Sequence, residues 1–374
     1  MSGARASAVR SVVAVFATLV AVVAQAAPDL SRLRLPAGFH IAVYATGVDN
    51  ARQLALAPDG ILYVGTRRAG RVYAVVDADA DKVGEKVHVL ARDLFMPSGV
   101  AWRDGSLYVA EVNRILRFDD IAARLERPGT PVVVSDTLPS ETHHGWKFIA
   151  FGPDGRLHVP VGAPCNVCEP PAPFASILSM APDGSDVATV ARGVRNSVGF
   201  DWHPDTGELW FSDNGRDWLG DDRPPGEINR VDSPGAHFGF PYVHGGDILD
   251  PEFGSGHAAA DYTPPALRLG AHVAPLGIEF YRGVAFPADY AGALFVAEHG
   301  SWNRSEKAGY RVMVARFTAD GSVASYVPFI EGWLRGDAYW GRPVDIETMA
   351  DGSLLIADDH AGVVYRVTYT APAQ

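Results

Sequence analysis

A short hairpin pattern recurs along this chain and constrains its fold more strongly than any other feature. In each copy an alternating apolar stretch meets an Asp/Gly turn and continues into a second β-rich stretch, as in LALAPDGILYVGT and IETMADGSLLIADD. Such alternation on both sides of a turn is typical of a β-hairpin. A looser copy reads VAFPADYAGALFVAEHG. The six turn aspartates are Asp59, Asp104, Asp154, Asp205, Asp289 and Asp351.

The spacing of these turns predicts the architecture. Neighbouring turn aspartates are 45, 50, 51, 84 and 62 residues apart, which suits four-stranded propeller blades with loop insertions. We therefore expect an all-β chain folded as a six-bladed β-propeller, with one domain from residue 27 to residue 374. The early stretch PAGFHIAVYATG has no hairpin of its own, and it could complete the last blade and close the ring. A jelly roll or two β-sandwiches are the alternative, although neither predicts six similar hairpins.

The N-terminal segment predicts export. Arg5 and Arg10 precede an apolar run over residues 12–23, and Ala24-Gln25-Ala26 follows as a small-residue cleavage site. This is the pattern of a secretory signal peptide, here residues 1–26. The run is shorter than the roughly 20 residues of a membrane span, although an uncleaved anchor stays open. We expect a periplasmic or secreted protein with no membrane span after cleavage.

Charge and motifs exclude several function classes. The formal net charge of -12, with no run of Lys or Arg, disfavours nucleic-acid binding and leaves room for cation sites. The chain has no serine elbow, P-loop, dinucleotide fingerprint or H-E-x-x-H motif. Nicotinamide cofactors and ATP are therefore not expected.

The two cysteines, Cys165 and Cys168, stand close together in GAPCNVCEP. In an oxidising compartment we expect a local disulfide that staples this loop. Covalent haem attachment needs a histidine where Glu169 stands, and zinc would need two further ligands.

Polar residues concentrate just before the first strand and just after the second strand of the repeated hairpins. Because such a hairpin begins and ends on one rim, these residues should gather around one mouth of the central channel. A rim of arginine, histidine and carboxylate groups suits an anionic ligand together with a metal; a solvated loop face with ordinary ion pairs is the alternative. The rim residues include Arg52, Gln53, Arg67, Arg68, Glu111, Asn113, Arg114, His143, His144, Lys147, Arg195, Asn196, Asp213, Asn214, Arg216, Glu298, His299, Asn303, Arg304, Arg342, Asp345, Asp358, Asp359 and His360.

Among these, His144 could be a general base, because the pKa of histidine lies near neutrality, or it could be an ordinary loop histidine. Arg195 and Arg342 could be anion clamps or blade-to-blade salt bridges.

At these residues the chain resembles the glucose/sorbosone dehydrogenase family, and within it the L-sorbosone dehydrogenase-like branch. The likeness runs from about Leu35 to Tyr369. Its most specific stretches are HHGWKFIAFGPDGRLHVPVGAPCN, ARGVRNSVGFDWHPDTGELWFSDNGRDWLGDD, GEINRVDSPGAHFGFPYVHGG and FVAEHGSWNRS. The resemblance implies a six-bladed propeller that uses pyrroloquinoline quinone (PQQ) with Ca²⁺.

The resemblance also implies catalytic roles. His144 matches the base that takes the substrate hydroxyl proton while hydride passes to the quinone. Relatives often carry an aspartate where His143 stands, so the group that orients the base differs here. Arg195 matches the arginine near the reactive carbonyls, and Asn196 lies beside the cofactor.

Metal and cofactor contacts are implied in the same way. Backbone carbonyls of Gly215 and Arg216 match the site of the catalytic Ca²⁺, and Arg216 stands where relatives commonly have proline. Glu227 resembles a residue at a second, structural Ca²⁺. Either Arg304 or His299 would bind a carboxylate of the cofactor. Arg342 matches the arginine of the last blade that clamps the cofactor.

We therefore expect an oxidoreductase that converts an aldose or aldehyde sugar to the lactone or acid. With no haem motif in the chain, electrons would pass to a separate acceptor, a cytochrome or a quinone. A calcium-dependent lactonase-like hydrolase and a non-catalytic propeller that binds a peptide or glycan are the alternatives.

Overall fold

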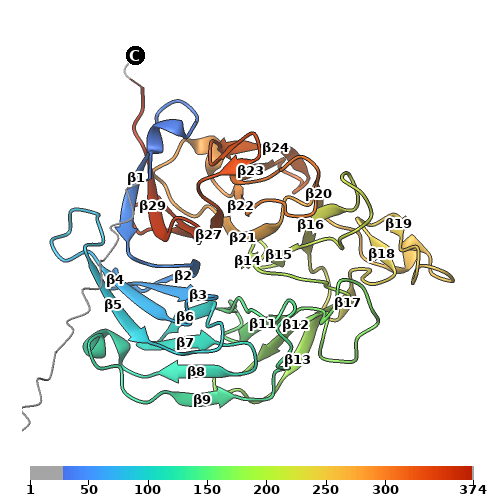
Figure 1. Ribbon diagram of the computed structural model, residues 1–374, viewed down its shortest axis with the longest axis horizontal. Helices are drawn as coiled ribbons and strands as arrows, with labels where there is room; N and C mark the ends of the chain where they lie inside the picture. The colour runs from blue at the N-terminus through green and yellow to red at the C-terminus, as the bar shows by residue number, and fades with distance from the viewer. Residues whose placement is uncertain (1–27, 373–374) are drawn as a thin grey trace, which may run out of the picture.

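The computed structural model describes residues 28–372, which fold as a six-bladed β-propeller (Figure 1). The colours run around the ring in chain order, so each blade follows its neighbour in the sequence. The fold prediction is therefore confirmed. The predicted signal peptide at residues 1–26 lies outside the described residues.

Each blade is an antiparallel sheet whose first strand lines the channel. The first three blades are β2 (Ala51–Leu56), β3 (Leu62–Thr66), β4 (Val72–Val76) and β5 (Lys86–Ala91); β6 (Gly99–Arg103), β7 (Ser106–Ala110), β8 (Ile115–Phe118) and β9 (Val132–Ser135); and β10 (Ala150–Phe151), β11 (Leu157–Val161), β12 (Ser176–Met180) and β13 (Ala188–Arg192), with β17 (Ala236–His237) added in parallel.

The last three blades complete the ring. They are β14 (Phe200–Trp202), β15 (Leu209–Asp213), β16 (Pro225–Arg230) and β20 (Leu267–Ala271); β21 (Pro275–Phe280), β22 (Leu294–Glu298), β23 (Arg311–Phe317) and β24 (Val323–Ile330); and β27 (Pro343–Thr348), β28 (Leu354–Asp358), β29 (Val363–Tyr369) and β1 (Phe39–Thr46).

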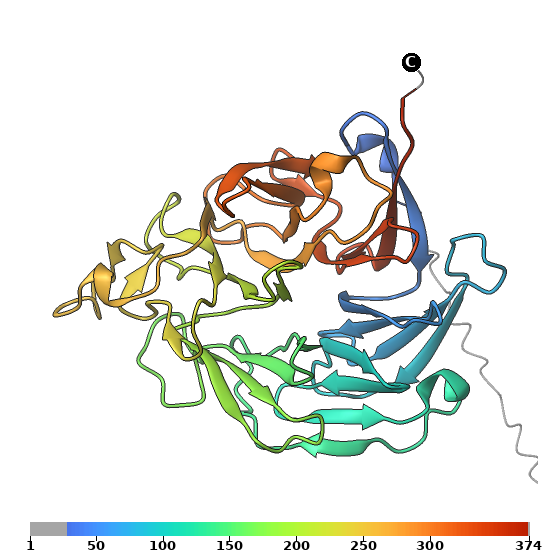
Figure 2. The same cartoon turned by 180° about the vertical axis from the view of Figure 1, so that it is seen from behind.

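Smaller elements lie outside the blades. The pairs β18 (Val243–His244) with β19 (Ile248–Leu249) and β25 (Leu334–Arg335) with β26 (Ala338–Tyr339) belong to rim loops, and the helical turns are η1 (Leu30–Arg32), η2 (Ile121–Arg124), η3 (Ala259–Asp261) and η4 (Ala288–Tyr290). The loop that carries β18 and β19 projects from the ring in both views (Figures 1 and 2). Among the described residues, none of the helices has the length and apolar character needed to cross a membrane.

The Asp/Gly turns work as their sequence predicts. In the first, third and sixth blades the turn aspartate accepts a hydrogen bond from the backbone N–H two residues later, for example from Ile61 to Asp59 at 3.2 Å. The following glycine takes a positive φ, such as 85° at Gly60. A short polar side chain and a residue without Cβ are therefore what closes these hairpins.

The fifth blade differs from its prediction. The looser copy VAFPADYAGALFVAEHG places the inner strand near Val284, but the inner strand is β21, which begins at Pro275. A long connection containing η4 joins β21 to β22. The prediction of the strand was wrong because the hairpin is interrupted, although the number of blades is unaffected.

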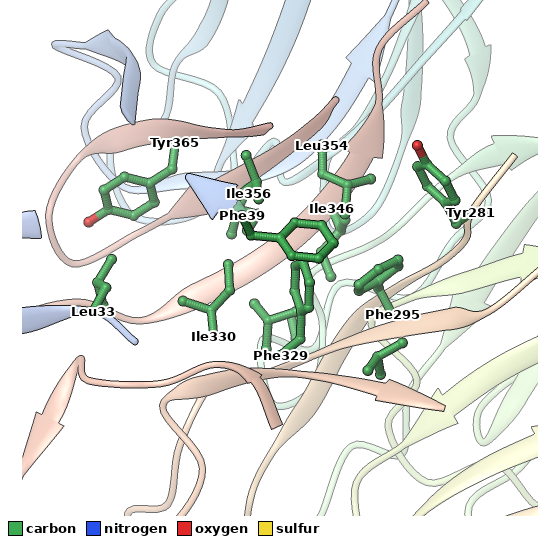
Figure 3. Close-up of a cluster of buried hydrophobic side chains, with 14 of the residues drawn as sticks. Leu33, Phe39, Tyr281, Phe295, Phe329, Ile330, Ile346, Leu354, Ile356 and Tyr365 are labelled. Atoms are coloured by element: carbon green, nitrogen blue, oxygen red, sulfur yellow. The ribbon is translucent and has the colours of Figure 1, made fainter. Parts of the chain in front are cut away.

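The N-terminal strand closes the ring as expected. β1 pairs antiparallel with β29 from Phe39↔Tyr369 to Thr46↔Val363, so the first and last described strands share one sheet (Figure 2). Phe39 anchors this closure in an apolar cluster between the last two blades (Figure 3). Its ring meets those of Phe286 and Phe329 edge to face, with centroids 4.8 and 5.0 Å away.

Polar side chains link the inner strands of neighbouring blades. The amide of Gln53 donates to the carbonyl of Ile149 at 2.7 Å and accepts from the N–H groups of Val100 and Ile149. The carboxylate of Asp345, on β27, accepts from the N–H of Leu54 at 2.8 Å. These bonds join the first blade to the second, third and sixth.

Replacing Phe39 by alanine should weaken the closure. Loss of a buried phenylalanine typically costs about 3–5 kcal/mol of the free energy of unfolding, and urea denaturation measures it. The next residue on β1, His40, is exposed, so His40→Ala should change that free energy by less than about 0.5 kcal/mol. A Phe39→Ala loss no larger than that of the control would contradict the anchoring role.

Candidate functional site

Two cavities occupy the two ends of the channel. The larger, of about 870 Å³, is lined by the turn ends of the inner hairpins. The smaller, of about 270 Å³, is lined by residues that precede the inner strands or follow the second strands. The smaller cavity therefore lies at the mouth where the sequence places its polar rim, and we refer to it as the mouth cavity.

The larger cavity has acidic walls. Asp201, Glu279, Asp345 and Glu347 line it. Burial, together with the charges of neighbouring carboxylates, raises the pKa values of Glu279 and Glu347 well above the ordinary value. Burial raises the pKa of Asp345 to about 7. When these carboxyl groups are ionised, they would repel an anionic ligand at this end.

The mouth cavity has the opposite character. Four arginines line it: Arg52, Arg67, Arg195 and Arg342. Among the described residues that line this cavity, Asp217 alone carries a carboxylate. The Oδ2 atom of Asp217 already accepts a hydrogen bond from Arg195 at 3.3 Å. This end of the channel favours an anion.

His144 enters the mouth cavity as a neutral base. Its Nδ1 lies 2.8 Å from the carbonyl oxygen of Ala163, which can only accept, so Nδ1 carries the proton and Nε2 does not. Nε2 forms no hydrogen bond with residues 28–372. Burial, with the charge of Arg195, lowers the pKa of His144 well below its ordinary value. Gly162 makes room, since a Cβ there would lie 2.6 Å from that of His144.

The exposed ring of His143 packs against that of His144, with centroids 4.2 Å apart. The Ala163 carbonyl, rather than His143, fixes the tautomer of His144.

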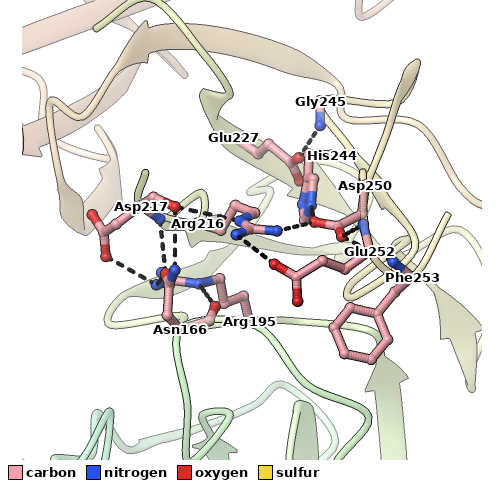
Figure 4. Close-up of polar contacts among 10 residues, drawn as sticks. All are labelled: Asn166, Arg195, Arg216, Asp217, Glu227, His244, Gly245, Asp250, Glu252 and Phe253. Atoms are coloured by element: carbon pink, nitrogen blue, oxygen red, sulfur yellow. Dashed lines mark hydrogen bonds and ion pairs between the residues drawn. The ribbon is translucent and has the colours of Figure 1, made fainter. Parts of the chain in front are cut away.

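Arg195 is held by the loop between the two cysteines (Figure 4). Its Nε donates to the carbonyl of Asn166 at 2.8 Å, and one terminal nitrogen donates to Asn166 Oδ1 at 2.8 Å and to Asp217. The other donates to the carbonyl of Asn214 at 3.0 Å. Of five N–H groups, four are engaged and one is left for a ligand. The predicted Cys165–Cys168 disulfide is present and closes this loop.

Arg342 is positioned by a chain of charged groups. Its Nη2 donates to Nδ1 of His299 at 2.7 Å, so the proton of His299 is on Nε2, which donates to Asp359 at 2.9 Å. Asp359 also accepts from Arg52 at 3.0 Å. Burial lowers the pKa of His299 to about 4, against the opposing charge of Asp359. With both ring nitrogens engaged, His299 orients Arg342.

Four buried polar atoms of residues that line the mouth cavity have no partner among the described residues. They are Oδ1 of Asn196, Nε1 of Trp146, Nε of Arg67 and Nε of Arg342. The guanidinium of Arg67 lies 3.6 Å above the ring of Trp146, and burial, with repulsion from Arg52, lowers the pKa of Arg67 to about 10. Buried polar groups are normally hydrogen-bonded, so their concentration here indicates a ligand site.

Gly215 and Arg216 are neighbours in the chain, but only Gly215 faces the mouth cavity. Gly215 lines it, and a Cβ there would lie 2.9 Å from the carbonyl oxygen of Pro225. The side chain of Arg216 instead turns to Asp250, at 2.5 Å, and Glu252 (Figure 4). The carbonyl oxygens of Gly215 and Arg216 accept no hydrogen bond from the part of the chain that the structure describes.

Glu227 lies behind the mouth cavity, opposite Asp213 on the neighbouring strand. Its carboxylate accepts from the N–H of Gly245 at 2.6 Å and from Asn229 at 3.0 Å. Both carboxylates line a small cavity of about 10 Å³, roughly the space of one water molecule. Burial, with the charge of Glu227, raises the pKa of Asp213 to about 7.

Arg304 is not brought to the mouth cavity. Its guanidinium contacts the carbonyl of Asp221 and, at 3.1 Å, the carboxylate of Asp222. The preceding Asn303 does line the cavity. The loop after β22 therefore turns outward between these two residues.

Sequence reasoning missed Asn166, Trp218 and Trp302. The signal for Asn166 is an amide between two cysteines whose disulfide fixes it. Trp218 and Trp302 are 68% and 69% exposed, and their rings pack edge to face with centroids 5.5 Å apart. Trp302 lines the mouth cavity, so this aromatic pair stands beside the entrance.

Two family models match parts of the chain. A family model described as Glucose / Sorbosone dehydrogenase matches residues 108–303, and one described as TrAA12-like matches residues 252–370. A Borreliella burgdorferi protein described as uncharacterized is 36% identical over 353 residues, covering 91% of each chain.

Solved structures share the fold. The holo form of the pyranose dehydrogenase PQQ domain from Coprinopsis cinerea has a TM-score of 0.75 at 19% identity, covering 90% of this chain and 97% of that one. The calcium structure of Trichoderma reesei Carbohydrate-Active Enzymes Family AA12 has a TM-score of 0.76 at 18% identity, covering 90% and 97%.

Asn166→Ala should destabilise the protein through Arg195. The variant removes the Oδ1 that accepts from Arg195 and from the N–H of Asp217, and a buried donor left unpaired costs about 1–3 kcal/mol. Chemical denaturation measures the loss. Asn113→Ala is the control, because its side chain forms no hydrogen bond with the described residues. Equal stability of the two variants would contradict the role of Asn166.

Proposed function

Because the chain belongs to the glucose/sorbosone dehydrogenase family, we propose that it is a PQQ- and Ca²⁺-dependent oxidoreductase. Its substrate would be an aldose or aldehyde sugar, oxidised to the lactone or acid at the mouth cavity. The observation that carries the proposal is the set of arginines and unpartnered buried polar atoms around one cavity beside a neutral histidine.

The residues of the mouth cavity fit PQQ, which is a tricarboxylate with a quinone. Arg67 and Arg342 have unpartnered Nε groups for its anionic oxygens, and Arg195 has one free N–H. Asn196 offers an unpartnered Oδ1 beside them. When bound, the quinone would supply the two-electron acceptor that no side chain can provide.

Carbonyl oxygens are suited to Ca²⁺, a hard cation with oxygen ligands. Those of Gly215 and Arg216 would hold the catalytic ion, since they accept no hydrogen bond from the described residues. Arg216 stands where relatives commonly have proline, but this difference matters little, because the side chain of Arg216 points away from the cavity. Glu227, together with Asp213, would hold a second, structural ion in the small cavity between them.

His144 would act as the base. Nε2 would accept the hydroxyl proton of a sugar hemiacetal or hydrated aldehyde, while Nδ1 keeps its own proton on the Ala163 carbonyl. His299 would remain a neutral support of Arg342 rather than a proton acceptor, because both its ring nitrogens are engaged. Arg304 would not contact the cofactor, since Asp221 and Asp222 hold its guanidinium outside the cavity.

The sugar would enter past Trp218 and Trp302, whose exposed rings offer apolar surface at the entrance. The names of the Coprinopsis cinerea and Trichoderma reesei proteins support a carbohydrate substrate. The sorbosone-like branch remains part of the proposal. We further propose export by the predicted signal peptide and transfer of electrons to a separate cytochrome or quinone.

Two other functions have less support. A calcium-dependent lactonase-like hydrolase would need several carboxylates around one metal, whereas this cavity is rich in arginine. A propeller that only binds a peptide or glycan would have no use for a buried unprotonated base beside the arginines of the cavity.

Adding PQQ and Ca²⁺ to the purified protein tests the proposal. The mixture should raise the unfolding temperature, because a ligand that binds only the folded state stabilises it. It should also reduce an artificial electron acceptor in the presence of an aldose or aldehyde from a substrate panel. No retained PQQ, and no reduction with any sugar of the panel, would sink the proposal.

Replacing His144 by alanine should lower kcat by about a hundredfold or more, as expected for loss of a general base, with PQQ still bound. His88→Gln, on the outer strand β5, is the control and should keep full activity.

The pH profile separates a base from a structural histidine. Burial lowers the pKa of His144, so the active unprotonated form persists as pH falls, and kcat/KM should decline only well below pH 6.5. An acid limb centred at or above pH 6.5, or a His144→Ala loss caused by absent PQQ, would count against this role.

A further inference from the structure

Four carboxylates converge on one hairpin loop that does not line the mouth cavity. Asp77, Asp79, Asp81 and Glu85 belong to the connection between β4 and β5, and each offers an oxygen within 4.8 Å of the others. They occupy positions one, three, five and nine of the sequence DADADKVGE. The same positions, with a backbone carbonyl at position seven, supply ligands in the Ca²⁺ loop of an EF-hand.

Hydrogen bonds wrap the loop around these carboxylates. Asp77 Oδ2 accepts from the N–H of Lys82 at 3.0 Å, and Asp81 Oδ1 accepts from Val83 at 2.8 Å. Lys82 has a φ of 72° at position six, where an EF-hand has an invariant glycine. The carbonyl of Val83, at position seven, accepts no hydrogen bond from the described residues.

Two buried polar oxygens beside the loop lack partners among residues 28–372. One is Oδ1 of Asp77, and the other is the hydroxyl of Tyr44, a side chain only 1% exposed. The ring of Tyr44 lies beneath the loop, since a Cβ on Gly84 would be 3.4 Å from the carbon that bears the hydroxyl. Burial, with the charges of Asp77 and Glu85, raises the pKa of Tyr44 to about 12.

No basic side chain of the described residues forms an ion pair with these four carboxylates. Four like charges within 4.8 Å repel one another, and an unpartnered buried oxygen adds a desolvation cost. A bound cation would remove both costs. The all-oxygen donor set in an exposed loop favours Ca²⁺ over the smaller Mg²⁺ or a nitrogen- and sulfur-seeking metal.

We propose that the loop Asp77–Glu85 binds one Ca²⁺ ion through its four carboxylates and the carbonyl of Val83. The ion fixes the loop of the first blade against β1, a strand of the last blade. The N–H of Gly84 already donates to the carbonyl of Tyr44 across this junction at 2.7 Å, and the loop stands beside β1 in both views (Figures 1 and 2). The bound ion would therefore stabilise the closure of the ring, and its site is independent of PQQ.

Calcium titration of the chelator-treated, PQQ-free protein tests the proposal. The double variant Asp79→Asn/Asp81→Asn should bind one Ca²⁺ fewer than the wild type in isothermal titration. Saturating Ca²⁺ should raise the unfolding temperature of the wild type by about 3 °C or more. In the variant the rise should be smaller, because the contribution of this site is lost. Asp136→Asn/Asp205→Asn, an equal charge change at exposed positions elsewhere, should bind as the wild type does.

Equal calcium stoichiometry and an equal rise in unfolding temperature for wild type and loop variant would overturn the proposal. So would an equal rise with Mg²⁺ in place of Ca²⁺. Because PQQ is absent and the mouth cavity is unchanged in the loop variant, failure of the proposed enzymatic function would leave these outcomes readable. A single Glu85→Gln variant, which keeps the three aspartates, should weaken binding at this site about tenfold.

Discussion

Each blade presents its inner strand to the channel as an edge strand, and the ring depends on how those edges are satisfied. An edge strand leaves backbone N–H and C=O groups unpaired, and here polar side chains of neighbouring blades bind them. Gln53 and Asp345 do so around the first blade, while Asp201 accepts from the N–H of Phe280 at 2.7 Å and Ser212 donates to the carbonyl of Leu276 at 2.7 Å. The channel wall is therefore rigid and polar for structural reasons, which makes the starts of the inner strands a precise base for a site.

The two mouths of this channel have opposite chemistry. One carries carboxylates with raised pKa values, and the other carries arginines held by Asn166, His299 and Asp359. These supporting residues allow several arginines to lie close together. Asp359 offsets the charge of Arg52 and orients His299, and His299 in turn orients Arg342. Placing a buried base among cations also explains why His144 stays unprotonated, since the charge of Arg195 adds to burial in lowering its pKa.

Local pattern predicted the fold well, because five hairpins keep their alternation and turn. The fifth blade broke the pattern, since its inner hairpin is interrupted before β22 begins. Hairpin geometry also placed His144, Arg195 and Arg342 at one mouth. It misjudged how far the rim extends at Arg304, where loop direction depends on contacts to Asp221. The flanking cysteines mark Asn166 in the sequence, but its role could not be predicted, because its hydrogen bonds reach Arg195 and Asp217 far along the chain. The spacing of the acidic loop can be read in the sequence, but the unpartnered buried oxygens of Asp77 and Tyr44, which distinguish it from a solvated turn, appear only in the structure.

The pairing of β1 with β29 also has a kinetic consequence. It joins Phe39 to Tyr369, almost the whole length of the described chain apart, whereas the other blades are built from neighbouring hairpins. Contacts between residues distant in sequence form late, because the loop-closure entropy must be overcome first. Five blades can therefore fold in order as the chain becomes available, while the sixth must wait until both ends are present. Until then the N-terminal strand is an unpaired, half-apolar edge, the part of the folding intermediate most prone to pair with another chain.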